Sequence, residues 1–182
     1  MHHRAVTTLI ADRYAAVHGA VPAVDYPHFC VVADECVPHA ALGYRRASEG
    51  ALFLESYLDG SVEELVSRQF GRPVDRGSIV EIGAHASDRS RATLSLWARA
   101  AEALGRDSDV AVAVLTAGMR AMFRRLGIAF AEIAPATPGR VADGPNAWGR
   151  YYDSDPSVCA GEIAPARARL APRFDSYRGV CR

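Results

Sequence analysis

An acidic residue lies in the middle of an apolar segment, residues 77–85, which reads Gly-Ser-Ile-Val-Glu-Ile-Gly-Ala-His. Strand side chains alternate between faces, so Glu81 shares a face with Gly83 and His85. Burying a carboxylate is costly unless it is paired, hydrogen-bonded or protonated. Two interpretations stay open from these residues: Glu81 pairs with one of the arginines, or it faces a cleft as a catalytic acid or base.

The composition describes a globular domain without a strong overall charge. The chain has 182 residues, 49% of them hydrophobic and 23% charged, and its formal net charge is zero. No global field therefore favours DNA or an anionic membrane as a partner. All 21 basic residues are arginines, which excludes lysine Schiff bases, a lysine general base and the P-loop lysine.

The cysteines give no metal-binding pattern. Cys30, Cys36, Cys159 and Cys181 show no CxxC spacing, so we expect no zinc or other metal. No signal peptide or apolar segment of membrane-spanning length is visible. We therefore expect a cytoplasmic protein with reduced thiols.

Alternating patterns and turn residues predict the elements that position Glu81. In the first half we expect a helix over 4–19, strands over 29–33, 41–47 and 52–58, and a helix that begins at Ser61 and ends before Gly71. In the second half we expect a helix capped by Ser87-Asp88, a strand over 110–115, a helix capped by Thr116, and strands over 128–133 and 157–163.

This order predicts an α/β fold with a mixed sheet in one domain, residues 1–164. The first three strands form an antiparallel meander, and the alternating strands and helices of the second half imply parallel pairing in a βαβαβ unit. Residues 165–182, rich in Arg, Pro and Ala, are expected to form a loosely packed tail. Glu81 precedes a strand-to-helix turn, where ligands of such sheets tend to bind.

Several ordered motifs resemble the thermostable hemolysin family. They are Ala41-Leu-Gly-Tyr-Arg, Leu52-Phe-Leu-Glu-Ser-Tyr-Leu-Asp, Gly71-Arg-Pro-Val-Asp-Arg-Gly-Ser-Ile-Val-Glu-Ile-Gly, Leu115-Thr-Ala, Met119-Arg-Ala-Met-Phe-Arg-Arg-Leu-Gly and Trp148-Gly-Arg-Tyr-Tyr-Asp, with Pro156, Val158 and Ala160-Gly161 after them. The resemblance implies a GNAT-like acyltransferase fold, similar to that of the acyl-homoserine-lactone synthases. Glu81 then resembles the acid of their Glu-x-Ser-Arg motif. Gly83 and Ala84 stand in place of Ser and Arg, so a homoserine-like substrate is not implied.

In a GNAT-like fold the acyl donor binds where the Glu81 strand meets the next helix, beside N–H groups that attract phosphate. The turn at 86–92 contains no glycine, which speaks against a standard acetyl-CoA site. Arg89 and Arg91 can hold one phosphate of a phosphopantetheine arm or an RNA, although for either one alone a solvated charge on the first helical turn is the favoured interpretation. We assign donor binding to Ala84, His85, Arg89, Arg91 and Thr116.

Acyl transfer to an amine needs a base and an acid. Glu81 is the expected base, directly or through water, and Tyr151 and Tyr152 are the candidate acids, with aromatic packing as the alternative. Cys159 is a possible nucleophile, but a buried structural thiol is the favoured interpretation. Glu55, Arg68 and Trp148 are candidate substrate-binding residues. Surface ion pairing is the favoured interpretation of Glu55 and Arg68, and aromatic packing is favoured for Trp148.

The leading functional hypothesis is a specialised-metabolism acyltransferase. It forms an amide by moving an acyl or aminoacyl group from a carrier to a small amine, with no covalently bound cofactor. The carrier is an acyl carrier protein or an aminoacyl-tRNA, and less readily CoA. A membrane-active hemolysin is one alternative, although no helix has a long basic amphipathic face. A GNAT-like binding protein without catalysis is the other.

Overall fold

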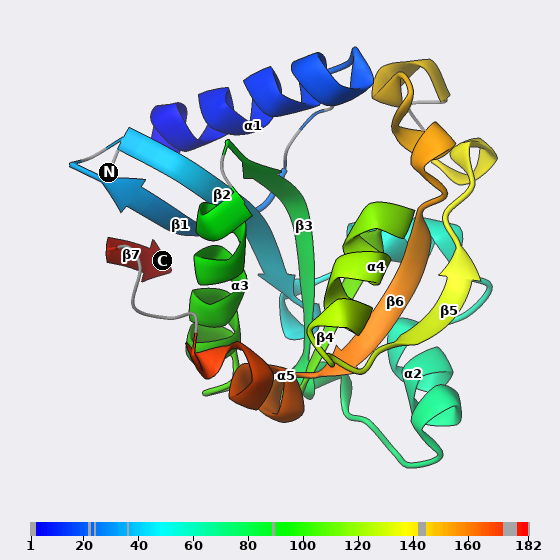
Figure 1. The fold of residues 1–182 in the computed structure, drawn as a ribbon. Helices are drawn as coiled ribbons and strands as arrows, with labels where there is room; N and C mark the ends of the chain where they lie inside the picture. The colour runs from blue at the N-terminus through cyan, green and yellow to red at the C-terminus, as the bar shows by residue number, and fades with distance from the viewer. Residues whose placement is uncertain are drawn as a thin grey trace.

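A seven-stranded mixed sheet forms the centre of the molecule, in the order β5-β6-β4-β3-β2-β1-β7 (Figure 1). The computed structural model describes residues 3–21, 23, 25–35, 37–88, 90–141, 145–172 and 178–181. The strands are β1 (His28–Asp34), β2 (Val37–Arg46), β3 (Ile79–Ser87), β4 (Val110–Leu115), β5 (Ala131–Pro135), β6 (Ser157–Glu162) and β7 (Arg178–Cys181). The α-helices are α1 (His3–His18), α2 (Val62–Phe70), α3 (Ser90–Leu104), α4 (Ala117–Arg125) and α5 (Ile163–Leu170).

Helices cover both faces of the sheet, and successive side chains of β1 pack against one face and then the other. Cys30 and Val32 pack in the cluster of α3, α4 and α5, whereas Val31 and Ala33 pack with α1. Helix α2 lies on the same face as α1 and packs against β3, β4 and β6. The Glu81 side chain points to the face covered by α1 and α2, because its neighbours Val80 and Ile82 belong to the α3 cluster.

The predicted mixed α/β sheet is confirmed. β1, β2 and β3 pair antiparallel, and β3 and β4 pair parallel. β5 runs in the direction of β4 but does not neighbour it, since β6 lies between them and is antiparallel to both. The alternation of strands and helices thus predicted correctly that β3, β4 and β5 run in the same direction. It could not show that β6, which follows them in the chain, lies between β4 and β5.

The strand predicted over 52–58 is wrong. The residues form the 3₁₀-helix η2 (Phe53–Tyr57), and the third antiparallel strand is β3 itself. Carboxylates take the backbone N–H groups that a strand would have paired: Glu55 accepts from Leu52 N at 2.9 Å, and Glu81 accepts from Phe53 N and Leu54 N. Side-chain acceptors therefore compete successfully with the sheet for this segment.

The segment expected to be a loose tail contains α5 and β7. Ile163 and Leu170 of α5 are buried against α3, and β7 pairs with the edge of β1. Cys30 is disulfide-bonded, in contrast to the reduced thiols we expected, and Cys181 of β7 lies directly opposite it in register. The C-terminal segment therefore contributes to the sheet and to the core.

Candidate active site

The parallel strands β3 and β4 separate halfway along their length. Their pairing ends at Ile82 and Ala113, although β3 continues to Ser87 and β4 to Leu115. An irregularity in β3 explains the separation: Ala41 pairs with Ala86 but Gly43 pairs with Gly83, and Ala84 has a positive φ of 48°. A bulge of this kind bends a strand away from its neighbour. Figure 1 shows β3 running beside β2 toward α1, away from β6.

A cleft of about 940 Å³ opens at this fork. Its walls come from α1, β2, β3, α3, β4, α4 and the 148–154 segment. The residues predicted for the site that line the cleft are Glu81, Ala84, His85, Thr116, Trp148 and Tyr151. Because the cleft is lined by both Glu81 and Ile82, whose side chains point to opposite faces, it passes through the sheet at the fork.

Glu81 is held by backbone groups rather than by an arginine. Its side chain is only 1% exposed, and its two oxygens accept hydrogen bonds from Phe53 N at 2.9 Å and Leu54 N at 2.8 Å. Among the described residues it forms no ion pair, although Arg45 lies opposite it on β2. Burial raises the pKa of Glu81, and the two N–H groups and the charge of Arg45 act in the opposite direction.

Tyr26, which the sequence reading missed, lies across two glycines beside Glu81. A Cβ at Gly43 would lie 2.5 Å from the Tyr26 ring, and one at Gly83 would clash with the Tyr26 hydroxyl. The ring therefore requires glycine at both positions. Burial, followed by the charge of Glu81, raises the pKa of Tyr26 well above its ordinary value, so its hydroxyl stays protonated. Gly43 and Gly83, which pair on neighbouring strands, are the sequence feature that could have indicated a side chain lying over them.

Aromatic side chains form the wall of the cleft on the α1 side. The Tyr151 ring lies 5.3 Å from Trp148 and 5.2 Å from His18, and Phe53 lies 5.6 Å from Trp148. The indole N–H of Trp148 is buried and has no hydrogen-bond partner among the described residues. These centroid distances are typical of packed aromatic pairs. The wall offers apolar surface and an unused donor to a bound molecule.

Tyr152, predicted as an acid, does not line the cleft. Its hydroxyl lies 2.9 Å from the hydroxyl of Tyr57, and Tyr57 is the one of the two that reaches the cleft. Consecutive residues of the 3₁₀-helix Tyr151–Ser154 point in different directions. Tyr152 is thus a supporting residue behind Tyr57.

Three further predicted residues also lie outside the cleft. Glu55 binds Arg76, with oxygen–nitrogen distances of 2.7 and 3.0 Å, and this pairing lowers the pKa of Glu55 to about 2. Arg68 and Arg91 are exposed and do not line the cleft. The ion-pair interpretation therefore describes Glu55 best. Arg89 lies outside the described residues.

On the other side of the fork, the cleft runs between α3 and α4. Thr116 caps α4 as predicted, its hydroxyl oxygen accepting from Met119 N at 3.3 Å. His85 stacks on Trp97 of α3, with ring centroids 5.7 Å apart. The expected shared face of Glu81 and His85 is therefore wrong, because the bulge at Ala84 shifts the alternation by one residue. Burial lowers the pKa of His85 to about 4, so the imidazole is neutral near pH 7, and its Nε2 is buried without a partner in the described structure.

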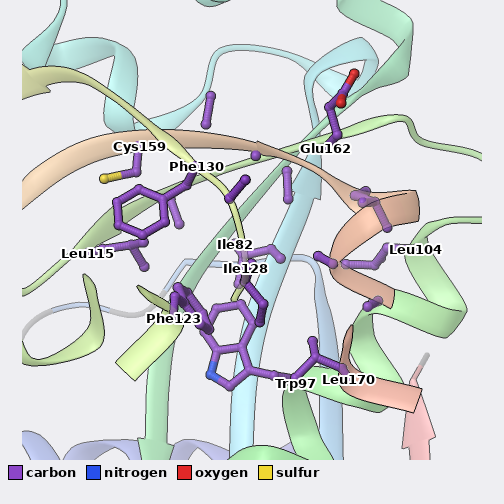
Figure 2. Close-up of a pocket in the computed structure, with 18 residues that line it drawn as sticks. Ile82, Trp97, Leu104, Leu115, Phe123, Ile128, Phe130, Cys159, Glu162 and Leu170 are labelled. Carbon is purple, nitrogen blue, oxygen red and sulfur yellow. The ribbon is translucent and has the colours of Figure 1, made fainter. Parts of the chain in front are cut away.

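A second, apolar cavity of about 80 Å³ lies behind the fork (Figure 2). It shares Ile82, Trp97, Ala113 and Leu115 with the cleft. Cys159 lines it, 2% exposed, and burial raises the pKa of its thiol to about 12, so it is not an activated nucleophile.

The fold is the GNAT-like fold of known acyl-transferring synthases. FeeM, an N-acyl amino acid synthase from uncultured soil microbes, matches with a TM-score of 0.58 at 19% identity, over 91% of this chain and 93% of its own. MesI, a CoA-dependent acyl-homoserine lactone synthase, matches with a TM-score of 0.58 at 14% identity, over 96% and 88%. LasI, an AHL synthase, matches with a TM-score of 0.57 at 14% identity, over 88% and 80%.

The chain belongs to the thermostable hemolysin family, whose model matches residues 1–167. A comparison with curated proteins found no match. Within the described part of the chain, no helix is both long and apolar enough to cross a membrane.

Proposed function

We propose that this protein is an N-acyltransferase that moves an acyl group from a carrier to a small amine and so forms an amide. One observation carries the proposal: the cleft passes through the sheet, with the buried Glu81 on one face and apolar surface between α3 and α4 on the other. Two substrates can thus meet at the fork from opposite faces. Holding two reactants in this way replaces a bimolecular encounter by a unimolecular step.

In the proposed reaction the amine binds on the Glu81 face, along the aromatic wall. The neutral amine nitrogen attacks the thioester or ester carbonyl carbon at the fork, and Glu81 accepts the proton that the nitrogen loses, directly or through water. The raised pKa of Glu81 makes it a stronger base than an exposed glutamate. The tetrahedral intermediate then collapses, and the bond between carbon and the carrier's sulfur or oxygen breaks.

The leaving group needs a proton, which we assign to Tyr26. Its hydroxyl lies over Gly83, on the face of Glu81. Tyr26 gives its proton to the leaving sulfur or oxygen and regains the proton held by Glu81, so the products are an amide and a free carrier thiol or hydroxyl. Tyr151 remains a second candidate donor, since it lines the same cleft.

The carrier is an acyl carrier protein or an aminoacyl-tRNA, and less readily CoA, because the turn after β3 has no glycine. FeeM is named as an N-acyl amino acid synthase and MesI as CoA-dependent, which supports an acyl donor and an amine acceptor here without choosing the carrier.

The test is to incubate the purified protein with each of the three donor types and a mixture of small amines, and to detect amides by mass spectrometry. The expected result is an amide from one donor type, formed about 100-fold more slowly by Tyr26→Phe. Absence of any amide from all three donor types would contradict the proposal. Ligand binding without turnover would favour a non-catalytic binding protein.

A further inference from the structure

We propose that Arg45 is a positioning residue of the site: it fixes Tyr26 over the two glycines and places a positive charge beside Glu81. The inference rests on the proposed function, because it concerns the acid and the base assigned there. Arg45 lines the cleft on β2, and its side chain is 23% exposed. It acts through Tyr26 and Glu81 and takes no part in the proton transfer itself.

Two neighbouring residue pairs of β2 and β3 bring these groups together. Gly43 of β2 pairs with Gly83 of β3, and the Tyr26 ring lies over both. Two positions further along β2, Arg45 pairs with Glu81. Residues paired across two strands share a face of the sheet, and so do residues two positions apart. The Arg45 side chain therefore starts on the Glu81 face, next to the glycine pair.

The guanidinium of Arg45 bridges two segments that lie outside the sheet. Its Nη2 donates to the carbonyl oxygen of Asp25 at 2.7 Å, and its Nη1 donates to the carbonyl oxygen of Ala51 at 3.3 Å. Asp25 directly precedes Tyr26, and Ala51 precedes η2, whose first N–H groups bind the base. A planar guanidinium holds two acceptors in a fixed geometry. Arg45 therefore ties the backbone that carries the acid to the backbone that binds the base.

The same guanidinium supplies a positive charge to the surroundings of Glu81. Burial raises the pKa of Glu81, the N–H groups of η2 and the charge of Arg45 lower it, and the charge of Glu55 raises it. Tyr26 and Tyr57 face the carboxylate as well, since burial and then the charge of Glu81 raise the pKa of both phenols. Arg45 is thus the cation that favours the charged form of the base.

The first test separates the charge of Arg45 from its bridge by measuring kinetics over a range of pH. Arg45→Gln removes both, so the rise of kcat/KM moves to higher pH, because the carboxylate has lost a charge that favours its ionised form. Its kcat on the plateau falls roughly 10- to 100-fold, because Tyr26 is no longer held in position. Arg45→Lys keeps the charge but cannot bridge both carbonyls, so it restores the pH profile without restoring kcat.

Arg46→Gln is the matched control. Arg46 is 27% exposed and binds Asp107 at 2.6 Å, but it does not line the cleft. Its loss removes a comparable arginine contact, and we expect the wild-type pH profile and kcat. The thermal midpoint of each variant is measured beside its activity, so that only folded proteins are compared.

A double-mutant cycle asks whether Arg45 acts through Tyr26. When Arg45→Gln is introduced into Tyr26→Phe, kcat on the plateau is expected to fall by only about twofold or less, because the proton donor is already absent. Losses that multiply, together with one pH profile for wild type and Arg45→Gln, would overturn the inference.

The second test does not depend on turnover. Glutamate carboxyl groups are labelled with ¹³C, the Glu81 signal is assigned by its absence in Glu81→Gln, and its titration is followed by NMR. We expect Glu81 to titrate at higher pH in Arg45→Gln than in wild type or Arg46→Gln. This shift without amide formation by wild type would support the place of Arg45 beside Glu81 and overturn the proposed function. Amide formation by wild type with no shift, and with losses that multiply, would overturn the inference and leave the proposed function standing.

Discussion

The Glu81 carboxylate combines deep burial with two backbone hydrogen bonds, and this environment makes its ionisation sensitive to pH. A base acts only when it is deprotonated, and burial raises the pKa of Glu81. We therefore predict that kcat/KM for amide formation rises with pH and reaches its plateau at a higher pH than an exposed glutamate, with its pKa of about 4.3, would give. His85 does not produce this rise near neutrality, because its pKa is lowered to about 4. A rate independent of pH between about 4 and 8 would rule out Glu81 as the base.

Replacing Glu81 affects the fold as well as the reaction. The substitution Glu81→Gln places an amide NH₂ against the N–H of Phe53 or Leu54, since both carboxylate oxygens accept. The loss of one buried hydrogen bond costs about 1–3 kcal/mol. The thermal midpoint of this variant must therefore be measured beside its activity.

Tyr26 and Gly83 form a matched pair for mutagenesis. We predict that Tyr26→Phe retains the fold, because the ring still fills the space over Gly43 and Gly83, and lowers kcat about 100-fold as the loss of a proton donor would. Gly83→Ala is expected to displace the ring and to lower both stability and kcat. Tyr152→Phe is the control, since Tyr152 does not line the cleft. Equal kcat values for wild type and Tyr26→Phe would remove Tyr26 from the mechanism.

At the scale of elements, a network around Arg76 fixes η2 and thereby the backbone that binds Glu81. Arg76 donates to Glu55, to Glu63 at 2.8 Å and to the carbonyl oxygens of Ala47 and Gly50. The pKa of Glu55 is lowered to about 2, so its carboxylate stabilises the fold above the ordinary value of about 4.3 and loses this contribution as the pH falls toward 2.

We predict that Glu55→Gln lowers the free energy of unfolding by about 2 kcal/mol near pH 7 and by much less near pH 2. Urea unfolding at both pH values measures the difference. Glu64→Gln is the control, because Glu64 is exposed on the same part of the chain. A difference that does not change with pH would mean that the Glu55–Arg76 pair is not the source of the effect.

The aromatic wall depends on a close approach between α1 and the turn at Gly149. Gly149 has a φ of 52°, a Cβ there would clash with the carbonyl oxygen of His18, and Arg150 N donates to the same oxygen at 2.8 Å. Gly149→Ala is expected to lower stability by about 1–3 kcal/mol and to raise KM for the amine. Gly139→Ala, in open space, is the control. Equal thermal midpoints for the two variants would contradict this account.

Elements with a strong local signal could be predicted from the sequence. The cap at Thr116 and the strand over 110–115 depend on a few neighbouring residues, and both appear as expected. The segment 52–58 alternates like a strand, yet the carboxylates of Glu55 and Glu81 take its N–H groups. One of these acceptors is distant in sequence, so periodicity could not reveal it.

At the scale of the whole molecule, the cleft forms because β3 and β4 separate and because α1, α3 and α4 border the opening between them. The sequence indicated Glu81 and the turn after its strand as part of a site. It did not indicate that α1 and Tyr26 complete the cleft. The position of Tyr26 depends on its contact with Gly43 of β2 and Gly83 of β3, which form no recognisable motif. The sequence also did not reveal that α5 lines the apolar cavity, because its composition suggested a loosely packed tail.

The fork also explains how one fold can bring two substrates together. β3 and β4 are paired from Ile79 to Ile82 and separate beyond Ile82 and Ala113, so the sheet stays continuous while an opening passes through it. One face of the opening is aromatic and carries Glu81, whereas the other face is apolar and adjoins the cavity of about 80 Å³. This division is the basis of the proposed acyl transfer.

The most direct measurement is a single-turnover reaction of the purified protein with each of the three acylated donor types and an isotopically labelled amine, followed by mass spectrometry. We predict one labelled amide for each carrier thiol or hydroxyl released from one donor type, and a rate that falls about 100-fold in Tyr26→Phe with an unchanged thermal midpoint. The same sample is added to dye-filled liposomes. Dye release without donor or amine, together with no labelled amide from any donor type, would contradict the account and favour membrane lysis.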